Sequence, residues 1–247
     1  MTSWETSSSW YDKIVGDKGH YYHQHVIIPG ILKLLQLKPG HRLLDLACGQ
    51  GVLARYLPQN VDYVGIDASF SLIQEAQKKS HHHFIVGDVS KPLNEGKFTH
   101  VSIILALQNI EEGGAVVKNA AVHLEKDGKC IIVLNHPCFR IPRQSAWGVD
   151  ETKKLQYRRI DRYLSPLKIP IQTHPGTQNS EKTWTFHHCL SDYTRWLQAS
   201  GFVIEVIEEW VSNKKSLGGQ ARMENRSREE FPLFLAILVK LDRKFVS

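Results

Sequence analysis

The chain has 247 residues and a formal net charge of +6, with 42% hydrophobic and 23% charged residues. This balance is typical of globular domains and argues against a disordered or fibrous protein. No apolar run approaches the roughly 18 residues of a membrane helix, and the N-terminus lacks the pattern of a signal peptide. With four scattered cysteines, the sequence predicts a cytoplasmic protein with reduced thiols. We expect one domain over residues 1–247.

The N-terminal residues are polar with aromatic positions, and we expect a lid or tail over residues 1–25. Apolar residues then recur at helical spacing from Ile27 to Leu35, before Pro39-Gly40 ends the helix. From residue 42 onward, apolar strand-like runs alternate with helix-like runs. The expected strands are 42–47, 62–67, 82–88, 100–107 and 129–135; the expected helices are 52–57, 71–79 and one through 116–124.

Residues 136–190 interrupt this alternation, because they are rich in proline, charge and aromatic side chains. We expect an irregular insertion there, on the substrate side. A helix over 191–201, with Ser191 as N-cap, a strand over 202–210, a polar loop over 212–230 and a strand over 231–241 are expected to follow. Strands alternating with helices predict a parallel sheet with helices on both faces.

A glycine-rich turn follows the first strand. "GQGVLA" (49–54) matches the G-x-G-x-x-A fingerprint of dinucleotide-binding proteins, and Asp67 follows Gly49 by 18 residues. A nicotinamide-dinucleotide enzyme is therefore one alternative. Asp45 argues against it, since a carboxylate beside the turn would repel a pyrophosphate. It would suit a ligand with an ammonium group and a sulfonium, and S-adenosylmethionine (SAM) has both.

Three carboxylates end three consecutive strands. Asp45, Asp67 and Asp88 stand at the carboxyl ends of the first, second and third strands. In open α/β sheets, ligands bind at this edge. The three acids therefore predict a binding site for a ligand with cationic and hydroxyl groups.

The motifs resemble those of the class I SAM-dependent methyltransferases of the small-molecule type, over residues 41–135. The resemblance implies a doubly wound, seven-stranded, mostly parallel sheet with an antiparallel last strand. One departure is Ala47, where many members have glycine; we expect alanine to be tolerated. The stretches that carry the resemblance are "LLDLACGQG" (43–51), "YVGIDAS" (63–69), "FIVGDV" (84–89), "ILALQNIEE" (104–112) and "LEKDGKCIIVLNHP" (124–137).

The resemblance also implies roles for residues in these motifs. Asp45 would orient the methionine ammonium, Asp67 would accept hydrogen bonds from both ribose hydroxyls, and Asp88 would accept one from the adenine amino group. Leu105 and Gln108 would lie near the sulfonium. The other cofactor-binding residues implied are Ala47, Gly49, Gly51, Ala68 and Val89.

The acceptor of the methyl group is harder to predict. Methyl transfer from a sulfonium needs a general base only if the acceptor must lose a proton, and His136 is the candidate base. Aromatic side chains and arginines of the insertion suit a small aromatic, quinone-like or acidic acceptor. The candidate acceptor-binding residues are Tyr21, Tyr22, Trp147, Tyr157, Arg158 and Tyr163.

Other functions stay open. Between Cys138 and Pro170 there are eight basic and three acidic residues, which would also suit RNA or a protein as acceptor. The Asn/Asp-Pro-Pro-aromatic motif of nucleobase methylases is missing after the fourth strand. A SAM-binding protein without catalysis is another alternative. No metal is expected, because the candidate zinc ligands have unusual spacing: His136, Cys138, His187, His188 and Cys189.

Overall fold

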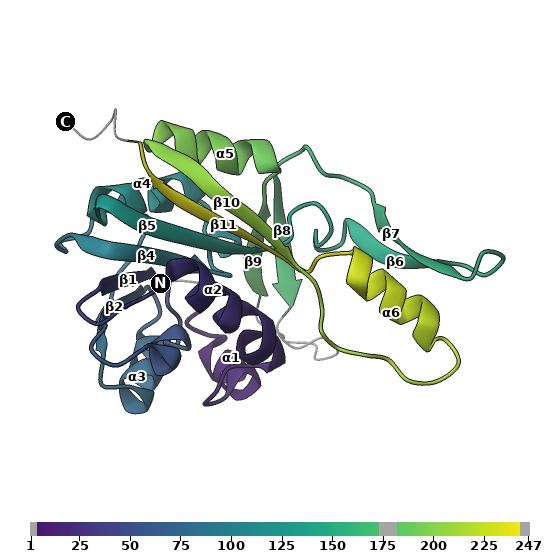
Figure 1. The fold of residues 1–247 in the computed structure, drawn as a ribbon, viewed down its shortest axis with the longest axis horizontal. Helices are drawn as coiled ribbons and strands as arrows, with labels where there is room; N and C mark the ends of the chain where they lie inside the picture. The colour runs from purple at the N-terminus through teal and green to yellow at the C-terminus, as the bar shows by residue number, and fades with distance from the viewer. Residues whose placement is uncertain (1–3, 173–181, 243–247) are drawn as a thin grey trace.

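The computed structural model describes residues 4–172 and 182–242. Residues 1–3 of the expected lid or tail and 173–181 of the expected insertion lie outside the described residues. A twisted seven-stranded sheet forms the centre, and helices cover both of its faces (Figure 1). No helix in the described ranges combines the length and the apolarity needed to cross a membrane.

The sheet has the predicted topology. Its order is β10-β11-β5-β4-β1-β2-β3, and every adjacent pair is parallel except the two that involve β11, which runs antiparallel to β10 and β5. This is the seven-stranded, mostly parallel sheet with an antiparallel last strand that we expected. The strands are β1 (Arg42–Leu46), β2 (Asp62–Asp67), β3 (His83–Val86), β4 (Phe98–Ile104), β5 (Leu124–Asn135), β10 (Phe202–Trp210) and β11 (Phe234–Leu241).

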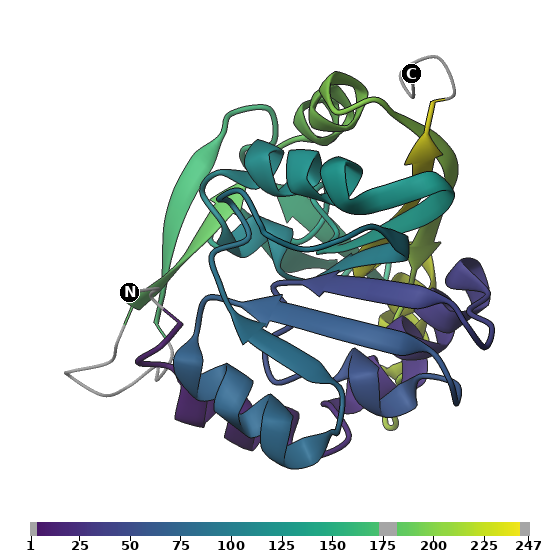
Figure 2. The ribbon, with the colours of Figure 1, turned by 90° about the vertical axis from the view of Figure 1, so that its left-hand side faces the viewer.

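Two apolar layers hold the helices on the sheet (Figure 2). On one face, α2 (Ile28–Leu35) and α3 (Phe70–Lys79) pack in a core with alternate residues of the strands. On the other, α4 (Gly113–His123) and α5 (Leu190–Ala199) do the same. The N-cap of α5 is Cys189, so the prediction of Ser191 was wrong. Because both faces are covered, the central strands are almost continuously apolar.

The segment around the glycine turn differs from the prediction. The expected helix over 52–57 is only a 3₁₀ turn, η2 (Leu53–Tyr56), because Pro58 follows after one further residue. Before the sheet, α1 (Ser8–Val15) and the π-helical η1 (His23–Ile27) precede α2. A second 3₁₀ turn, η3 (Leu107–Asn109), follows β4.

The insertion after β5 is more regular than predicted. It contains two antiparallel hairpins, one formed by β6 (Ser145–Asp150) and β7 (Leu155–Ile160), the other by β8 (Leu167–Gln172) and β9 (Lys182–His187). Figure 1 shows the first hairpin extending away from the central sheet beside α6 (Ala221–Glu230). The second lies at the carboxyl ends of the parallel strands (Figure 2).

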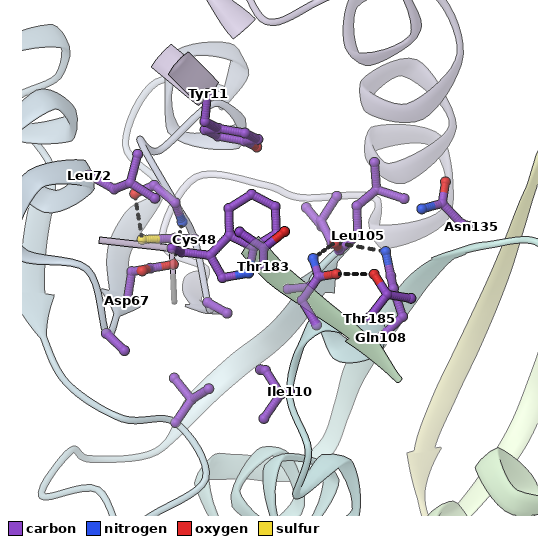
Figure 3. A pocket seen from close by; sticks show the side chains of 18 of the residues that line it. Tyr11, Cys48, Asp67, Leu72, Leu105, Gln108, Ile110, Asn135, Thr183 and Thr185 are labelled. Carbon is purple, nitrogen blue, oxygen red and sulfur yellow. Dashed lines mark hydrogen bonds between the residues drawn. The ribbon is translucent and has the colours of Figure 1, made fainter. Parts of the chain in front are cut away.

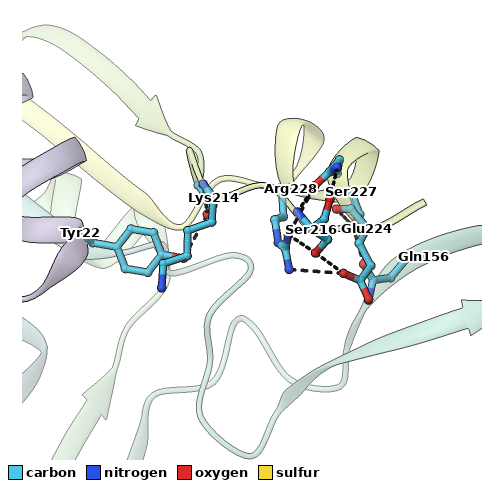
Figure 4. Close-up of polar contacts among 9 residues, drawn as sticks. Tyr22, Gln156, Lys214, Ser216, Glu224, Ser227 and Arg228 are labelled. Atoms are coloured by element: carbon cyan, nitrogen blue, oxygen red, sulfur yellow. Dashed lines mark hydrogen bonds and ion pairs between the residues drawn. The ribbon is translucent and has the colours of Figure 1, made fainter. Parts of the chain in front are cut away.

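The polar loop expected over 212–230 contains α6, so that expectation was wrong. Of the residues of α6, only Ser227 is buried, and the helix has no apolar stripe that would mark it in the sequence. Polar contacts stabilise it instead (Figure 4): Ser227 Oγ donates to Gln156 Oε1 of β7, and Ser216 Oγ donates to Glu224.

Candidate active site

A cavity of about 980 Å³ opens at the carboxyl ends of the parallel strands. The loops after β1, β2, β3 and β4 form one side of it. Trp4 and Tyr11 of the N-terminal segment and Thr183 to Phe186 of β9 form other parts of the wall. Figure 3 shows Tyr11, Asp67, Leu105 and Thr183 around this space, although they come from distant parts of the chain. The volume is at the upper end of the range for small-molecule sites.

Asp45 faces the cavity from the end of β1, with only 3% of its surface exposed. Its carboxylate accepts hydrogen bonds from Tyr63 Oη (2.8 Å) and Ser102 Oγ (2.7 Å). Burial raises the pKa of Asp45 to about 6; the two hydroxyls lower it and the charge of Asp67 raises it. The two hydroxyls offset part of the cost of burial, and the raised pKa shows that they do not offset all of it.

The loop after β1 has a left-handed backbone at two cavity-lining positions. Ala47 has φ of 57° and Gly49 has the same value. This region is strained for residues with a Cβ atom, by about 1 kcal/mol, so Ala47 carries a backbone strain that Gly49 does not. Cys48 N donates to Ile66 O (3.0 Å), which fastens the loop to β2.

Asp67 joins the first two loops at the cavity. One carboxylate oxygen accepts from the backbone N–H of Gly49 (2.9 Å), and the other accepts from that of Ser69 (2.8 Å). Burial raises the pKa of Asp67, and these two hydrogen bonds act in the opposite direction. The exposed Ala68, which follows Asp67, also lines the cavity.

The loops after β3 and β4 contribute the remaining predicted cofactor residues. Asp88 is exposed and accepts from Ser90 N and Ser90 Oγ, and the buried Val89 lies beside it on the cavity wall. The Leu105 carbonyl accepts from Gln108 Nε2 (2.9 Å). Gln108 Oε1 is buried and has no hydrogen-bond partner in the described part of the chain, so it can accept one from a ligand.

Gly51 is the one predicted cofactor residue that does not line the cavity. It has φ of 68°, and a Cβ atom there would lie 2.6 Å from Phe84 Cε1. We expect Gly51→Ala to lower the free energy of unfolding by about 2–4 kcal/mol, from overpacking and backbone strain together. Gly49→Ala is the control, since its Cβ would lie 3.7 Å from Tyr11 Cε1 and the expected loss is about 1 kcal/mol. Denaturant unfolding of both variants checks this; equal losses would contradict it.

His136, the candidate base, is not among the cavity residues. It is 1% exposed, its Nε2 lies 2.7 Å from Glu209 Oε1, and its Nδ1 accepts from Cys138 N (3.2 Å). Burial lowers the pKa of His136 despite Glu209. With both nitrogens engaged, the imidazole holds the start of the insertion to β10.

Of the candidate acceptor-binding residues, only Tyr22 lines the cavity. Its hydroxyl lies 3.0 Å from Ser212 Oγ. Trp147 and Arg158 contact each other across the β6–β7 hairpin, with the guanidinium 5.1 Å from the ring centroid. The structure does not bring Tyr21, Trp147, Tyr157, Arg158 or Tyr163 to the cavity.

Several residues that line the cavity were not predicted from the sequence to belong to the site. Tyr11 of α1 lies beside Gly49, and burial together with the charge of Asp67 raises its pKa to about 12. Asn135 and Arg140 approach from the end of β5, and Thr185 from β9. In the described ranges, no group of three or more potential ligands is placed to hold a metal ion.

Comparisons with known proteins agree with this fold. Residues 44–132 match the family model of the methyltransferase domain. Curated protein sequences give no significant match. Among solved structures, a SAM-dependent methyltransferase from Listeria monocytogenes has a TM-score of 0.68 and 24% identity, over 87% of this chain and 98% of the other.

Two further structures are similar. A SAM-dependent methyltransferase from Mesorhizobium loti has a TM-score of 0.68 and 22% identity, over 91% of this chain and 100% of the other. The glycopeptide N-methyltransferase MtfA, in complex with SAM, has a TM-score of 0.58 and 15% identity, over 87% of this chain and 93% of the other. The methyltransferase domain match decides against a nicotinamide-dinucleotide enzyme. Residues 44–132 are therefore similar to a methyltransferase domain, and the chain has the Rossmann-like fold of SAM-dependent methyltransferases.

Proposed function

We propose that the protein methylates a small molecule, which is aromatic, quinone-like or acidic. This proposal depends on one observation, which is that the cavity lining has two chemically different parts. The acids Asp45, Asp67 and Asp88 line it at the ends of β1, β2 and β3, whereas aromatic and polar side chains line it at β5 and β9. The first part suits the cofactor, and the second leaves room for an acceptor.

The residues of the first part fit SAM. The buried carboxylate of Asp45 would pair with the methionine ammonium, Asp67 would accept from the ribose hydroxyls, and Asp88 would accept from the adenine amino group. The backbone N–H of Val89 would donate to the adenine ring. When bound, SAM supplies an electrophilic methyl group, and the protein's part is to position the acceptor and exclude water.

We propose that the N-terminal segment acts as a lid over the cofactor. Glu5 anchors it, because its carboxylate accepts from Ser69 Oγ (2.7 Å) and Ser71 Oγ (2.6 Å) at the start of α3. Two residues before Ser69, Asp67 faces the cavity. Trp4 and Tyr11 of the same segment contribute to the cavity wall and contact each other edge to face.

The second part of the cavity supports a small acceptor. Trp184 and Phe186 of β9 offer apolar surface, and Thr185 and Asn135 offer hydrogen-bonding groups. A few polar groups within an apolar wall are typical of sites for small organic molecules. His136 does not line the cavity, so we do not assign it as the general base. We therefore propose an acceptor whose attacking atom is already unprotonated or loses its proton to water.

RNA or a protein as acceptor is the alternative that the basic insertion suggested. The contacts argue against it, because several of these cations already have partners within the protein. Arg158 donates to Phe139 O (2.7 Å) and Ser145 Oγ (2.8 Å). Lys153, Arg159 and Lys168 form ion pairs with Asp150, Asp161 and Glu111. The three ion pairs weaken the positive potential that the insertion would present to a polyanion.

The test is a methyl-transfer assay that measures S-adenosylhomocysteine (SAH) formation from SAM. The acceptors are a panel of small aromatic acids, phenols, amines and quinols, alongside total RNA and a mixture of unfolded proteins. We expect SAH formation with members of the small-molecule panel alone. Formation with RNA that declines steeply with salt would support the alternative. Tight SAH binding without turnover on any acceptor would support a non-catalytic binding protein.

A further inference from the structure

Arg140 is a partly buried cation on the cavity wall, in the loop after β5. Its Nη1 donates to Asn135 Oδ1 (2.6 Å) and to Leu233 O (3.4 Å). Its guanidinium carbon lies 5.4 Å from the centroid of the Phe234 ring. These contacts hold the side chain in one place, but all of them are made to neutral groups.

No carboxylate of the described residues lies within ion-pair distance of Arg140, whereas Lys168, the other lysine or arginine in the cavity lining, has a counter-ion. Lys168, which also lines the cavity, has its Nζ 3.0 Å from Glu111 Oε2. Burial lowers the pKa of Arg140, Tyr22 acts in the opposite direction, and the positive charge of Arg158 lowers it further. A buried cation without a counter-ion is costly, and an anionic ligand would remove that cost.

The position of Arg140 separates it from the cofactor-side acids. Asn135, which binds Arg140, ends β5 and pairs in register with Phe234 of β11. In the sheet, β4 lies between β5 and β1, the strand that carries Asp45. A guanidinium fork matches the two oxygens of a carboxylate. Nη1 donates to Asn135 and Leu233, and within residues 4–172 and 182–242 Nη2 and Nε have no hydrogen-bond partner. We propose that Arg140 binds a carboxylate of the methyl acceptor, which is therefore a small organic acid. This proposal rests on the proposed function.

The experiment measures the melting temperature of the SAH-saturated protein with matched pairs of acid and amide at millimolar concentration. The pairs are benzoate with benzamide and indole-3-acetate with indole-3-acetamide, with ionic strength equalised by sodium chloride. We expect each acid to raise the melting temperature more than its amide does. In Arg140→Gln this preference disappears, and in Arg140→Lys it is reduced but present. In the control Lys168→Gln it is unchanged, because Glu111 already neutralises Lys168.

Calorimetric titration of each variant with SAH and with methylthioadenosine provides the second measurement. We expect Arg140→Gln to bind both within about twofold of wild type, which also shows that the variant is folded. If Arg140→Gln loses SAH affinity tenfold or more but keeps methylthioadenosine affinity, Arg140 binds the cofactor's own carboxylate, and the proposal is overturned. Acids and amides acting alike, or no acid acting at all, would overturn it too. Failure of SAH to bind the wild type would instead contradict the proposed function.

Discussion

Asp67→Ala is expected to weaken SAH binding at least 100-fold. In the proposed complex, the carboxylate accepts hydrogen bonds from both ribose hydroxyls, and hydrogen bonds to charged groups contribute about 1.5–3 kcal/mol each. Two such bonds correspond to a factor of at least about 100 in the dissociation constant. Isothermal titration calorimetry with SAH, and with NAD beside it, measures the change directly.

The control for this prediction separates binding from loop structure. Asp67 also holds the N–H groups of Gly49 and Ser69, so its removal disturbs the loops themselves. The 2′-deoxyribose analogue of SAH is therefore titrated as well. We expect it to bind wild type more weakly than SAH does, and to bind Asp67→Ala about as weakly as SAH does. An Asp67→Ala variant that still prefers SAH over the deoxy analogue would show that the ribose contact lies elsewhere.

Asp88→Asn is the matched carboxylate variant, and we expect a loss of SAH affinity of less than about tenfold, since Asp88 is exposed.

Below about pH 6, the affinity for SAH is expected to fall up to tenfold for each unit of pH. Burial raises the pKa of Asp45 to about 6 in the free protein, so the carboxyl is ionised above this pH and protonated below it. A ligand ammonium pairs with the ionised form alone, and each pH unit of deprotonation costs about 1.4 kcal/mol. The affinity is therefore constant above about pH 6 and is lost as pH falls through the pKa.

Methylthioadenosine is the matched ligand for the pH experiment, because it has the adenosine part of the cofactor but neither the ammonium nor the carboxylate. Asp67 and the cavity histidines His20 and His23 can also titrate, and their effects on the adenosine part apply to both ligands. We expect the ratio of the two affinities to change with the pKa of Asp45, and to become nearly independent of pH in Asp45→Asn. Equal pH profiles for both ligands in the wild type would show that the ligand ammonium does not pair with Asp45.

Tyr63 and Ser102 partly explain why a carboxylate is tolerated inside β1. Both hydroxyls donate to Asp45, and they come from β2 and β4, the two strands that flank β1. The sequence indicated an acid within a buried strand and a cationic ligand as its partner. It did not indicate the hydroxyl donors, because strands distant in sequence become neighbours only in the folded sheet.

The sequence alone determined the succession of strands and helices along the chain and the edge of the sheet at which the acids meet. Strands buried on both faces are continuously apolar, and in surface helices apolar residues recur at helical spacing. The motifs of the resemblance mark the loops between them. The class of fold, the cofactor and the cavity positions of Asp45, Asp67, Asp88 and Gln108 were all accessible in this way, since each depends on residues close together in the chain.

Only the tertiary structure decided which of the other side chains reach the cavity. The β8–β9 hairpin lines it and the β6–β7 hairpin does not, although both are rich in aromatic and basic residues. Tyr11 and Arg140 reach it as well, whereas His136 turns to Glu209. Helix α6 forms through polar contacts with β7 and with its own loop rather than through an apolar stripe. In all these cases the outcome depends on contacts between segments far apart in the chain, which local composition and periodicity do not specify.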